Sequence, residues 1–132
     1  MGITSPAAFL HLSYNGLHLR YQIHNIILDL SKKGVILCIC SKNNEKDVWR
    51  TFQNRKMELT KKDFLFPKIN WFEKYINIKK TLAELSLKED DVLFIDDSKL
   101  EIYKVKKKIP KISTLTPEDI SEYLEKLQEH PR

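Results

Sequence analysis

A short run of four apolar residues, Val92–Ile95, leads directly into two adjacent aspartates, Asp96 and Asp97. An unbroken apolar run of this length, rich in β-branched and aromatic residues, predicts a strand that is buried on both faces. Such strands belong to parallel sheets covered by helices, and these sheets bind ligands at the carboxyl ends of their strands. The two carboxylates therefore stand where chemistry is expected. Because adjacent acids repel each other, they also indicate a nearby cation.

The rest of the chain alternates strand-like and helix-like segments. That alternation predicts an α/β fold of the three-layer Rossmann-like type, with a mostly parallel sheet and helices on both faces. Gly34 is well placed to end the first helix, and Thr116 followed by proline is a typical start of the last. We expect an irregular connection at 61–70. The expected strands are Ala7–Leu12, Val35–Cys40, Met57–Leu59, Val92–Ile95 and an edge strand around Ile112, and the expected helices are 17–33, 47–52, 71–87, 99–108 and 117–129.

The length and composition indicate one globular domain. We expect it to span residues 1–132, with 1–16 as either a strand or a truncated start and 117–129 as a C-terminal helix. A hydrophobic content of 42% and a charged content of 31% argue against disorder. Because the sequence has neither a signal peptide nor an apolar run of roughly 20 residues, we expect a cytoplasmic protein that does not enter a membrane.

Cys38 and Cys40 are the only cysteines, and they stand two residues apart in an expected strand. Residues at this spacing point to the same face of a strand, in a geometry that does not suit a disulfide. A lone pair at this spacing is also weak evidence for a metal site. We therefore interpret both as buried free thiols of a reducing compartment.

The net charge of +5 comes from lysines that are scattered along the chain. A nucleic-acid surface would gather them on one face together with arginines or interleaved aromatic residues. We therefore expect a solvated surface and no nucleic-acid partner, while attraction of phosphorylated or acidic partners stays open. The lysine clusters are Lys32–Lys33, Lys61–Lys62, Lys79–Lys80 and Lys106–Lys108.

Three kinds of polar residue stand at comparable places in the expected fold. Ser41 follows one buried strand, Lys74 lies early in a helix, and Asp96 with Asp97 follows another strand. A hydroxyl, an ammonium group and two carboxylates together suit a phosphoryl group held beside a divalent ion. Each feature alone has a plainer interpretation, since such serines and aspartates often cap helices and such lysines are often solvated.

The segments that carry these residues resemble a known family. VILCICSKNNEKDVW, KINWFEKYINI and DVLFIDDSKLE, in this order and spacing, are similar to the haloacid dehalogenase (HAD) superfamily and, within it, to the FkbH-like branch. The resemblance implies a HAD-type sheet and a magnesium-dependent phosphatase or phosphotransferase. It assigns phosphate binding to Ser41, Lys42, Asn43 and Lys74, and magnesium binding to Asp96 and Asp97. For the FkbH-like branch it implies a phosphorylated small molecule or an acyl-carrier protein as partner.

The sequence departs from the family at the motif that supplies the nucleophile. HAD proteins carry a DxDxT pattern at the end of the first strand, but the only acid before Ser41 is Asp29, inside an expected helix. Aligning Ala7–Leu12 with the family's first strand places His11 and Ser13 at the two aspartate positions. The alternative is that the first strand is missing. Neither side chain reproduces a carboxylate, so we expect a pseudoenzyme that is inactive alone and binds magnesium weakly or not at all.

Two further points stay open at this stage. The chain could instead be a non-catalytic binding protein that recognises a carrier protein or a phosphorylated ligand, and a sheet without its middle strand could dimerise. Trp71 and Phe72 could form a substrate platform, although an aromatic pair that starts a helix more often packs into the core. We expect packing for this pair.

Overall fold

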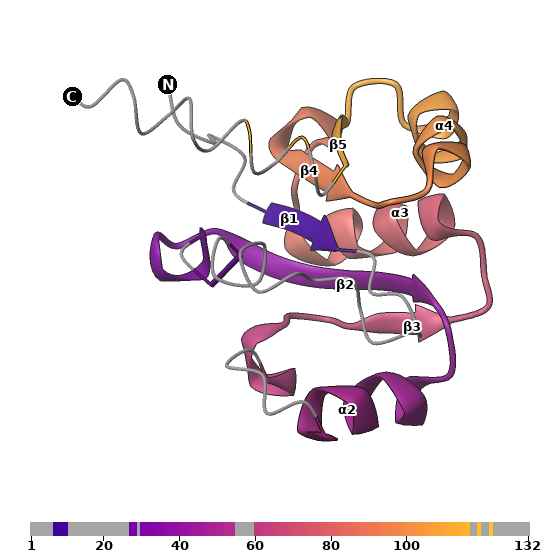
Figure 1. Ribbon diagram of the computed structural model, residues 1–132. Coiled ribbons are helices and arrows are strands. Elements are labelled where there is room, and N and C mark those ends of the chain that lie inside the picture. The colour runs from indigo at the N-terminus through magenta and orange to yellow at the C-terminus, as the bar shows by residue number, and fades with distance from the viewer. Residues whose placement is uncertain are drawn as a thin grey trace.

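The computed structural model describes residues 7–10, 27–28, 30–54, 60–116, 119 and 122. Within these residues a single sheet of five strands has the order β3-β2-β1-β4-β5 (Figure 1). All of the pairs between neighbouring strands are parallel, as the sequence predicts. The strands are β1 (Ala7–Leu10), β2 (Ile36–Lys42), β3 (Lys68–Asn70), β4 (Val92–Ile95) and β5 (Ser113–Leu115).

The central position of the sheet is occupied by β1. Its last residue, Leu10, is paired with Ile39 of β2 on one side and with Ile95 of β4 on the other. Of the two alternatives for the first strand, the structure therefore agrees with the one in which Ala7–Leu12 supplies it. The residues that follow Leu10, including His11 and Ser13, lie outside the described part of the chain.

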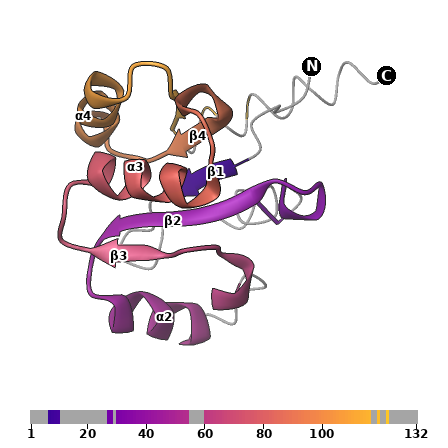
Figure 2. The same cartoon turned by 180° about the vertical axis from the view of Figure 1, so that it is seen from behind.

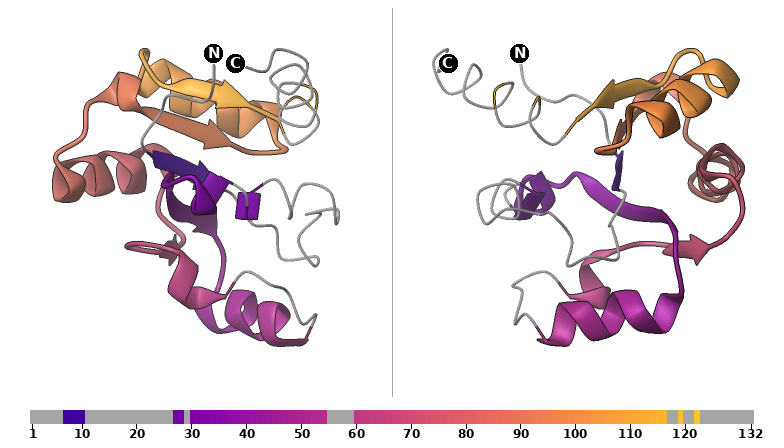
Figure 3. Two further views of the ribbon diagram at one scale, coloured as in Figure 1. Left: turned by 90° about the vertical axis from the view of Figure 1, so that its left-hand side faces the viewer. Right: turned by 45° about the vertical axis from the view of Figure 1, so that its right-hand side comes forward.

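Helices cover both faces of this sheet and make a three-layer fold. The helix α3 lies in front of the central strands in Figure 2, and Figure 3 shows the layers from two further sides. None of the helices in the described ranges is long and apolar enough to cross a membrane. The helices are α2 (Glu45–Asn54), α3 (Lys74–Leu85) and α4 (Lys99–Lys108), with short 3-10 turns η1 (Lys61–Asp63) and η2 (Glu89–Asp91); residues 27–28 and 30–32 are also helical.

Alternation along the strands divides the core into two apolar layers. In β1, Ala8 faces one layer while Ala7 and Phe9 face the other. The first layer packs the strands against α2 and the helical residues 27–28 and 30–32, and the second packs them against α3 and α4. The first layer contains Ile27, Leu30, Leu37, Ile39, Val48, Phe52, Phe64, Leu93 and Ile95, and the second contains Cys38, Cys40, Ile78, Leu82, Val92, Phe94, Val105, Ile109 and Ile112.

The outer strand that pairs with β2 differs from the one that the sequence predicts. The strand next to β2 is β3, which lies in the segment expected as an irregular connection, while Met57–Leu59 falls outside the described residues. This strand has only three residues, too few to show an alternating pattern, and Pro67 stands directly before it. Its pairing with residues 40–42 extends β2 through Ser41 and Lys42. Ser41 is therefore inside the strand rather than after it.

Two residues that were predicted to mark the ends of helices do so in the structure. Gly34 has φ +91°, and its N–H donates to the Ser31 carbonyl at 3.0 Å while the Val35 N–H donates to the Leu30 carbonyl at 3.0 Å. These bonds form a glycine-terminated helix cap. At the other end of the chain, the Thr116 hydroxyl accepts a bond from the Asp119 N–H at 3.1 Å, although most of the expected helix 117–129 is not described.

Replacing Gly34 with alanine is expected to lower the free energy of unfolding by about 1–2 kcal/mol. A Cβ atom at this position meets nothing within 4 Å, so the loss would come from the left-handed backbone alone. Urea denaturation measures the effect. Gly34→Asn is the control and should lose less, because asparagine tolerates this conformation. An alanine variant as stable as the parent would contradict the assignment.

The burial of the two cysteine thiols leads to a prediction of how the free energy of unfolding changes at alkaline pH. Both thiols are fully buried, and burial raises the pKa of Cys38 and of Cys40 from 9.0 to about 12. Above about pH 9 the unfolded chain releases these protons while the folded chain keeps them, so stability falls as pH rises. We expect a loss of about 1 kcal/mol per thiol between roughly pH 9 and pH 10.

This loss is measured by urea denaturation of the parent and of the Cys38→Ala/Cys40→Ala variant. The variant is expected to show a shallower decline over that pH range, because the two proteins differ only in the two thiols. Equal slopes would mean that the thiols do not differ between the folded and unfolded states.

Candidate functional site

The carboxyl ends of β2, β3 and β4 lie at the same end of the sheet, on the right in Figure 1. We call this end, at which the strands finish, the carboxyl edge. Each of these strands delivers polar residues to the edge: Ser41 and Lys42 end β2, Asn70 ends β3, and Asp96 follows β4. A parallel sheet with this order binds ligands at such an edge. The sequence-predicted site residues in the described part of the chain therefore converge on one end of the fold.

A buried ion pair lies at the centre of this edge. The Lys74 ammonium group lies 2.6 Å from Asp96 Oδ2, and the two side chains are 3% and 0% exposed. Asp96 Oδ1 accepts a second hydrogen bond from the Ser98 N–H at 2.9 Å. The Lys74 carbonyl in turn accepts a bond from the Cys40 thiol at 3.4 Å. The pair thus joins the start of α3 to the end of β4, with β2 bonded to the lysine backbone.

The end of β2 contributes a second buried polar group. Ser41 is fully buried, and its hydroxyl accepts a bond from the Asn43 side-chain amide at 3.1 Å. The Asn43 backbone N–H donates to the Asn70 carbonyl at 3.2 Å, which fixes the turn between β2 and α2. This turn holds the Ser41 side chain at the carboxyl edge of the sheet.

Four charged side chains form a closed ring beside the ion pair, which we call the charge ring. Lys42 is bonded to Glu73 and lies 3.5 Å from Glu101. Lys104 lies 3.5 Å from Glu73 and 3.6 Å from Glu101. The hydrogen bond between Lys42 and Glu73 is the main cause that raises the pKa of the lysine and lowers that of the glutamate. The ring connects the end of β2 to α4 and to the residue before α3.

The ring meets the ion pair at one carboxylate. Glu101 Oε1 lies 3.6 Å from the Lys74 ammonium group as well as 3.5 Å from that of Lys42. Three ammonium groups and three carboxylates are thus linked, and their formal charges cancel. Glu73, Glu101 and Lys104 are the part of the site that sequence reasoning missed. The available signals were the position of Glu73 directly before Lys74 and that of Glu101 in the first turn of α4.

The described residues do not by themselves fit a magnesium site. Both Asp96 oxygens already accept hydrogen bonds, and Asp97 is exposed on the turn that precedes α4. Within the described ranges there is no group of three histidine, cysteine, aspartate or glutamate side chains that could hold a metal ion. Magnesium usually takes one or two carboxylates together with waters and a phosphate oxygen. Here the cation beside Asp96 is the ammonium group of Lys74.

The resemblance assigns the remaining side of the site to the stretch after β1. His11 and Ser13, which the resemblance aligns with the family's aspartates, lie outside the described residues, and their role stays a prediction. The sequence itself is informative here, because no aspartate or glutamate occurs between Leu10 and Asp29. No carboxylate therefore directly follows the central strand.

An aromatic pair stands beside the edge, and the expectation that it packs into the core is wrong. Trp71 is 67% and Phe72 59% exposed. They precede α3 rather than starting it, since α3 begins at Lys74. The Asn70 side chain accepts a bond from the Phe72 N–H at 3.0 Å, and the Trp71 ring donates to the Asn44 side chain at 3.1 Å.

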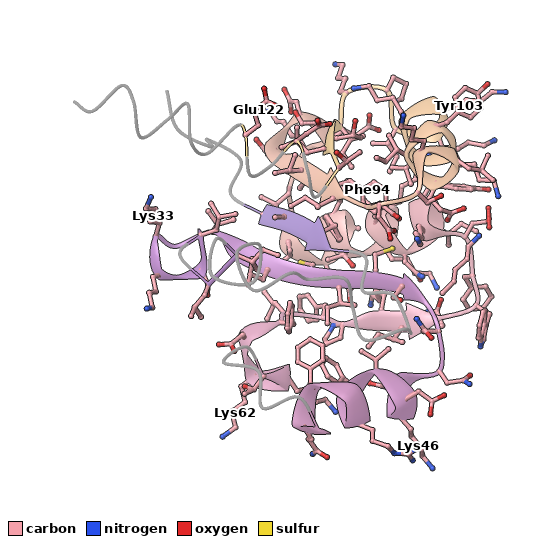
Figure 4. The ribbon with its side chains drawn as sticks, in the orientation of Figure 1. Lys33, Lys46, Lys62, Phe94, Tyr103 and Glu122 are labelled. Carbon is pink, nitrogen blue, oxygen red and sulfur yellow. The ribbon has the colours of Figure 1, made fainter. Side chains whose placement is uncertain are left out.

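Figure 4 labels one buried and one exposed aromatic side chain, from β4 and α4. Phe94 of β4 lies in the interior, whereas Tyr103 projects from the outer face of α4. The lysines labelled there, Lys33, Lys46 and Lys62, lie on the periphery, in agreement with a solvated surface.

Removing the cation of the buried pair should be strongly destabilising. Lys74→Met leaves the Asp96 carboxylate buried and uncompensated, and we expect a loss of about 3–5 kcal/mol in the free energy of unfolding. The matched control is Lys68→Met, which removes a more exposed pair with Glu84 at 2.9 Å and should cost about 1 kcal/mol or less.

Urea denaturation of both variants makes the comparison. In the double variant Lys74→Met/Asp96→Leu neither charge stays buried, so much of the lost stability should return. A Lys74→Met variant that loses no more than the control would show that the pair is not buried as described.

Comparison with solved structures finds the same architecture in a phosphatase domain. The N-terminal part of a Bacteroides fragilis protein, which contains a phosphatase domain and is complexed with Mg, matches with a TM-score of 0.79 and 25% identity. The match covers 93% of this chain and 40% of that chain. An uncharacterized protein from Corynebacterium glutamicum matches with a TM-score of 0.55 at 12% identity, over 85% of this chain and 84% of that one.

Comparison of sequences adds no assignment. No protein-family model matches the chain, and no match is found among curated proteins. The chain spans about two fifths of the length of the Bacteroides fragilis chain, so the structural likeness concerns only that part of it. The chain has the parallel α/β fold of a HAD-like phosphatase domain.

Proposed function

We propose that this chain is a HAD-like domain of the FkbH type that binds a phosphorylated ligand at the carboxyl edge of its sheet but does not hydrolyse it alone. The observation that carries the proposal is the Lys74 ammonium group, which is buried at this edge where three strands end. A lysine is rarely buried this fully without a functional or structural partner. The likeness of the fold to a protein that contains a phosphatase domain and is complexed with Mg also supports the proposal.

The surrounding groups suit the recognition of phosphate oxygens. The Ser41 hydroxyl can donate a hydrogen bond to an oxygen, and the amide of Asn43 lies 3.1 Å from that hydroxyl. The ammonium group of Lys74 offsets the charge of the ligand, and Lys42 brings a second ammonium group to the rim through the charge ring. These groups are of the kinds that recognise phosphate oxygens, which supports binding as the proposed function.

Hydrolysis by the family's mechanism requires a nucleophile that this chain does not offer at the expected place. The phosphoryl group is transferred to an aspartate in such enzymes, and the residues aligned with that aspartate pair are His11 and Ser13. A serine without a positioned base is a weak nucleophile. We infer that phosphate esters bind and are released unchanged.

A second candidate function, docking of a partner such as an acyl-carrier protein without any chemistry, is favoured by a different observation. Trp71 and Phe72 are exposed next to the edge, and aromatic residues are enriched in protein–protein contacts. In this case the Lys74 pair would be purely structural.

Isothermal titration with inorganic phosphate, with and without magnesium, distinguishes the two functions. The proposal predicts saturable binding that Ser41→Ala weakens by about threefold or more, because one hydrogen bond is lost. Ser113→Ala, which alters an exposed serine of β5, is the matched control and should leave binding unchanged. An absence of phosphate binding under both conditions would favour docking instead.

The proposed lack of hydrolysis has its own test. We expect no turnover of a generic phosphate ester above that of buffer with magnesium. Measurable turnover that Asp96→Asn abolishes would overturn this part of the proposal, because it would show a working phosphatase centre in the chain.

A further inference from the structure

Glu101 stands out because its carboxylate lies among three ammonium groups. Its Oε1 lies 3.5 Å from Lys42 Nζ and 3.6 Å from Lys74 Nζ, and its Oε2 lies 3.6 Å from Lys104 Nζ. Its side chain is only 14% exposed, in contrast to the 36% of Glu73, the other acid of the charge ring. No other carboxylate in the described residues has three lysine partners among the ion pairs found.

The backbone position of Glu101 is fixed by the start of α4. It lies in the first turn of α4, where its backbone N–H donates to the hydroxyl of the capping residue Ser98 at 3.2 Å. The Ser98 N–H is itself bonded to Asp96. A short chain of hydrogen bonds therefore links the backbone of Glu101, through Ser98, to Asp96 of the buried ion pair.

We propose that Glu101 is an intramolecular counter-anion, which occupies the place that a ligand oxyanion would take among Lys42, Lys74 and Lys104 and so limits the affinity of the site for dianions. This inference rests on the proposed phosphate binding and deepens it. An incoming phosphate meets one ammonium group, Lys74, that is already compensated by Asp96 and approached by Glu101. Binding must displace the Glu101 carboxylate or bear its repulsion.

The same arrangement predicts which ligands gain most when Glu101 is neutralised. Repulsion between two charges rises in proportion to the charge of the ligand. A phosphate monoester dianion should therefore gain more than a monoanion such as formate. Glu101 is thus a residue that determines specificity for ligand charge, without contact to the bond that a phosphatase would cleave.

Titration of the Glu101→Gln variant with inorganic phosphate tests the inference. The substitution keeps the shape of the side chain and removes its charge, and Coulomb's law at a few ångströms predicts at least about tenfold tighter binding than that of the parent. Formate should gain less. Glu84→Gln is the matched control, since it makes the same change at an acid paired with Lys68, and should leave the affinity unchanged.

Other results of this titration would overturn the inference, the proposed function, or both. If Glu101 merely positions Lys74, the variant would bind phosphate more weakly, and that outcome or an unchanged affinity would overturn the inference while leaving the proposed function intact. If the parent does not bind phosphate but the variant does, the inference stands and the proposed function of the parent fails. Failure of both proteins to bind would overturn both.

A measurement on the unaltered protein covers the case in which the variant does not fold. The carboxyl carbon of Glu101 is followed by nuclear magnetic resonance while phosphate is added. Displacement from the lysines should shift its signal saturably, whereas the signal of Glu84 should stay in place. A Glu101 signal that does not respond while phosphate binds would contradict the role of counter-anion.

Discussion

The buried ion pair between Lys74 and Asp96 is the interaction on which the carboxyl edge of the sheet depends. At 2.6 Å and with almost no exposure, it ties the start of α3 to the end of β4. Two charges taken out of water are costly unless each is compensated. The Ser98 N–H and the Glu101 carboxylate supply part of that compensation. The proposed binding of a phosphorylated ligand rests on this same lysine.

The order of the sheet explains why these residues meet. With β1 in the centre, β2 and β4 flank it, and their carboxyl ends deliver Ser41 and Asp96 to one edge. Parallel strands require crossovers, and the crossovers α3 and α4 bring Lys74 and Glu101 to the same edge. The proposed binding of a phosphorylated ligand rests on the buried lysine at this edge, and the proposed lack of hydrolysis rests on a central strand that no carboxylate directly follows.

The sequence predicted the elements whose signals are local and strong. The strand Val92–Ile95 and the helix at 99–108 were correct to the residue, because an unbroken apolar run and a capping serine define them. The strand β3 was missed, since three residues carry no period and only pairing with β2 makes them a strand. The charge ring was missed for a related reason. Its members come from β2, from α4 and from the residue before α3, and no sequence pattern reveals that Glu73 and Glu101 share the same lysines.

X-ray diffraction from crystals grown with tungstate, a heavy analogue of phosphate, tests the central claim most directly. The account predicts a single strong anomalous peak within hydrogen-bonding distance of the Lys74 ammonium group, at the carboxyl edge between the ends of β2 and β4, with Glu101 moved away from its lysines. A peak located only on surface lysines, or no ordered tungstate at this edge, would contradict the claim that the edge binds phosphate.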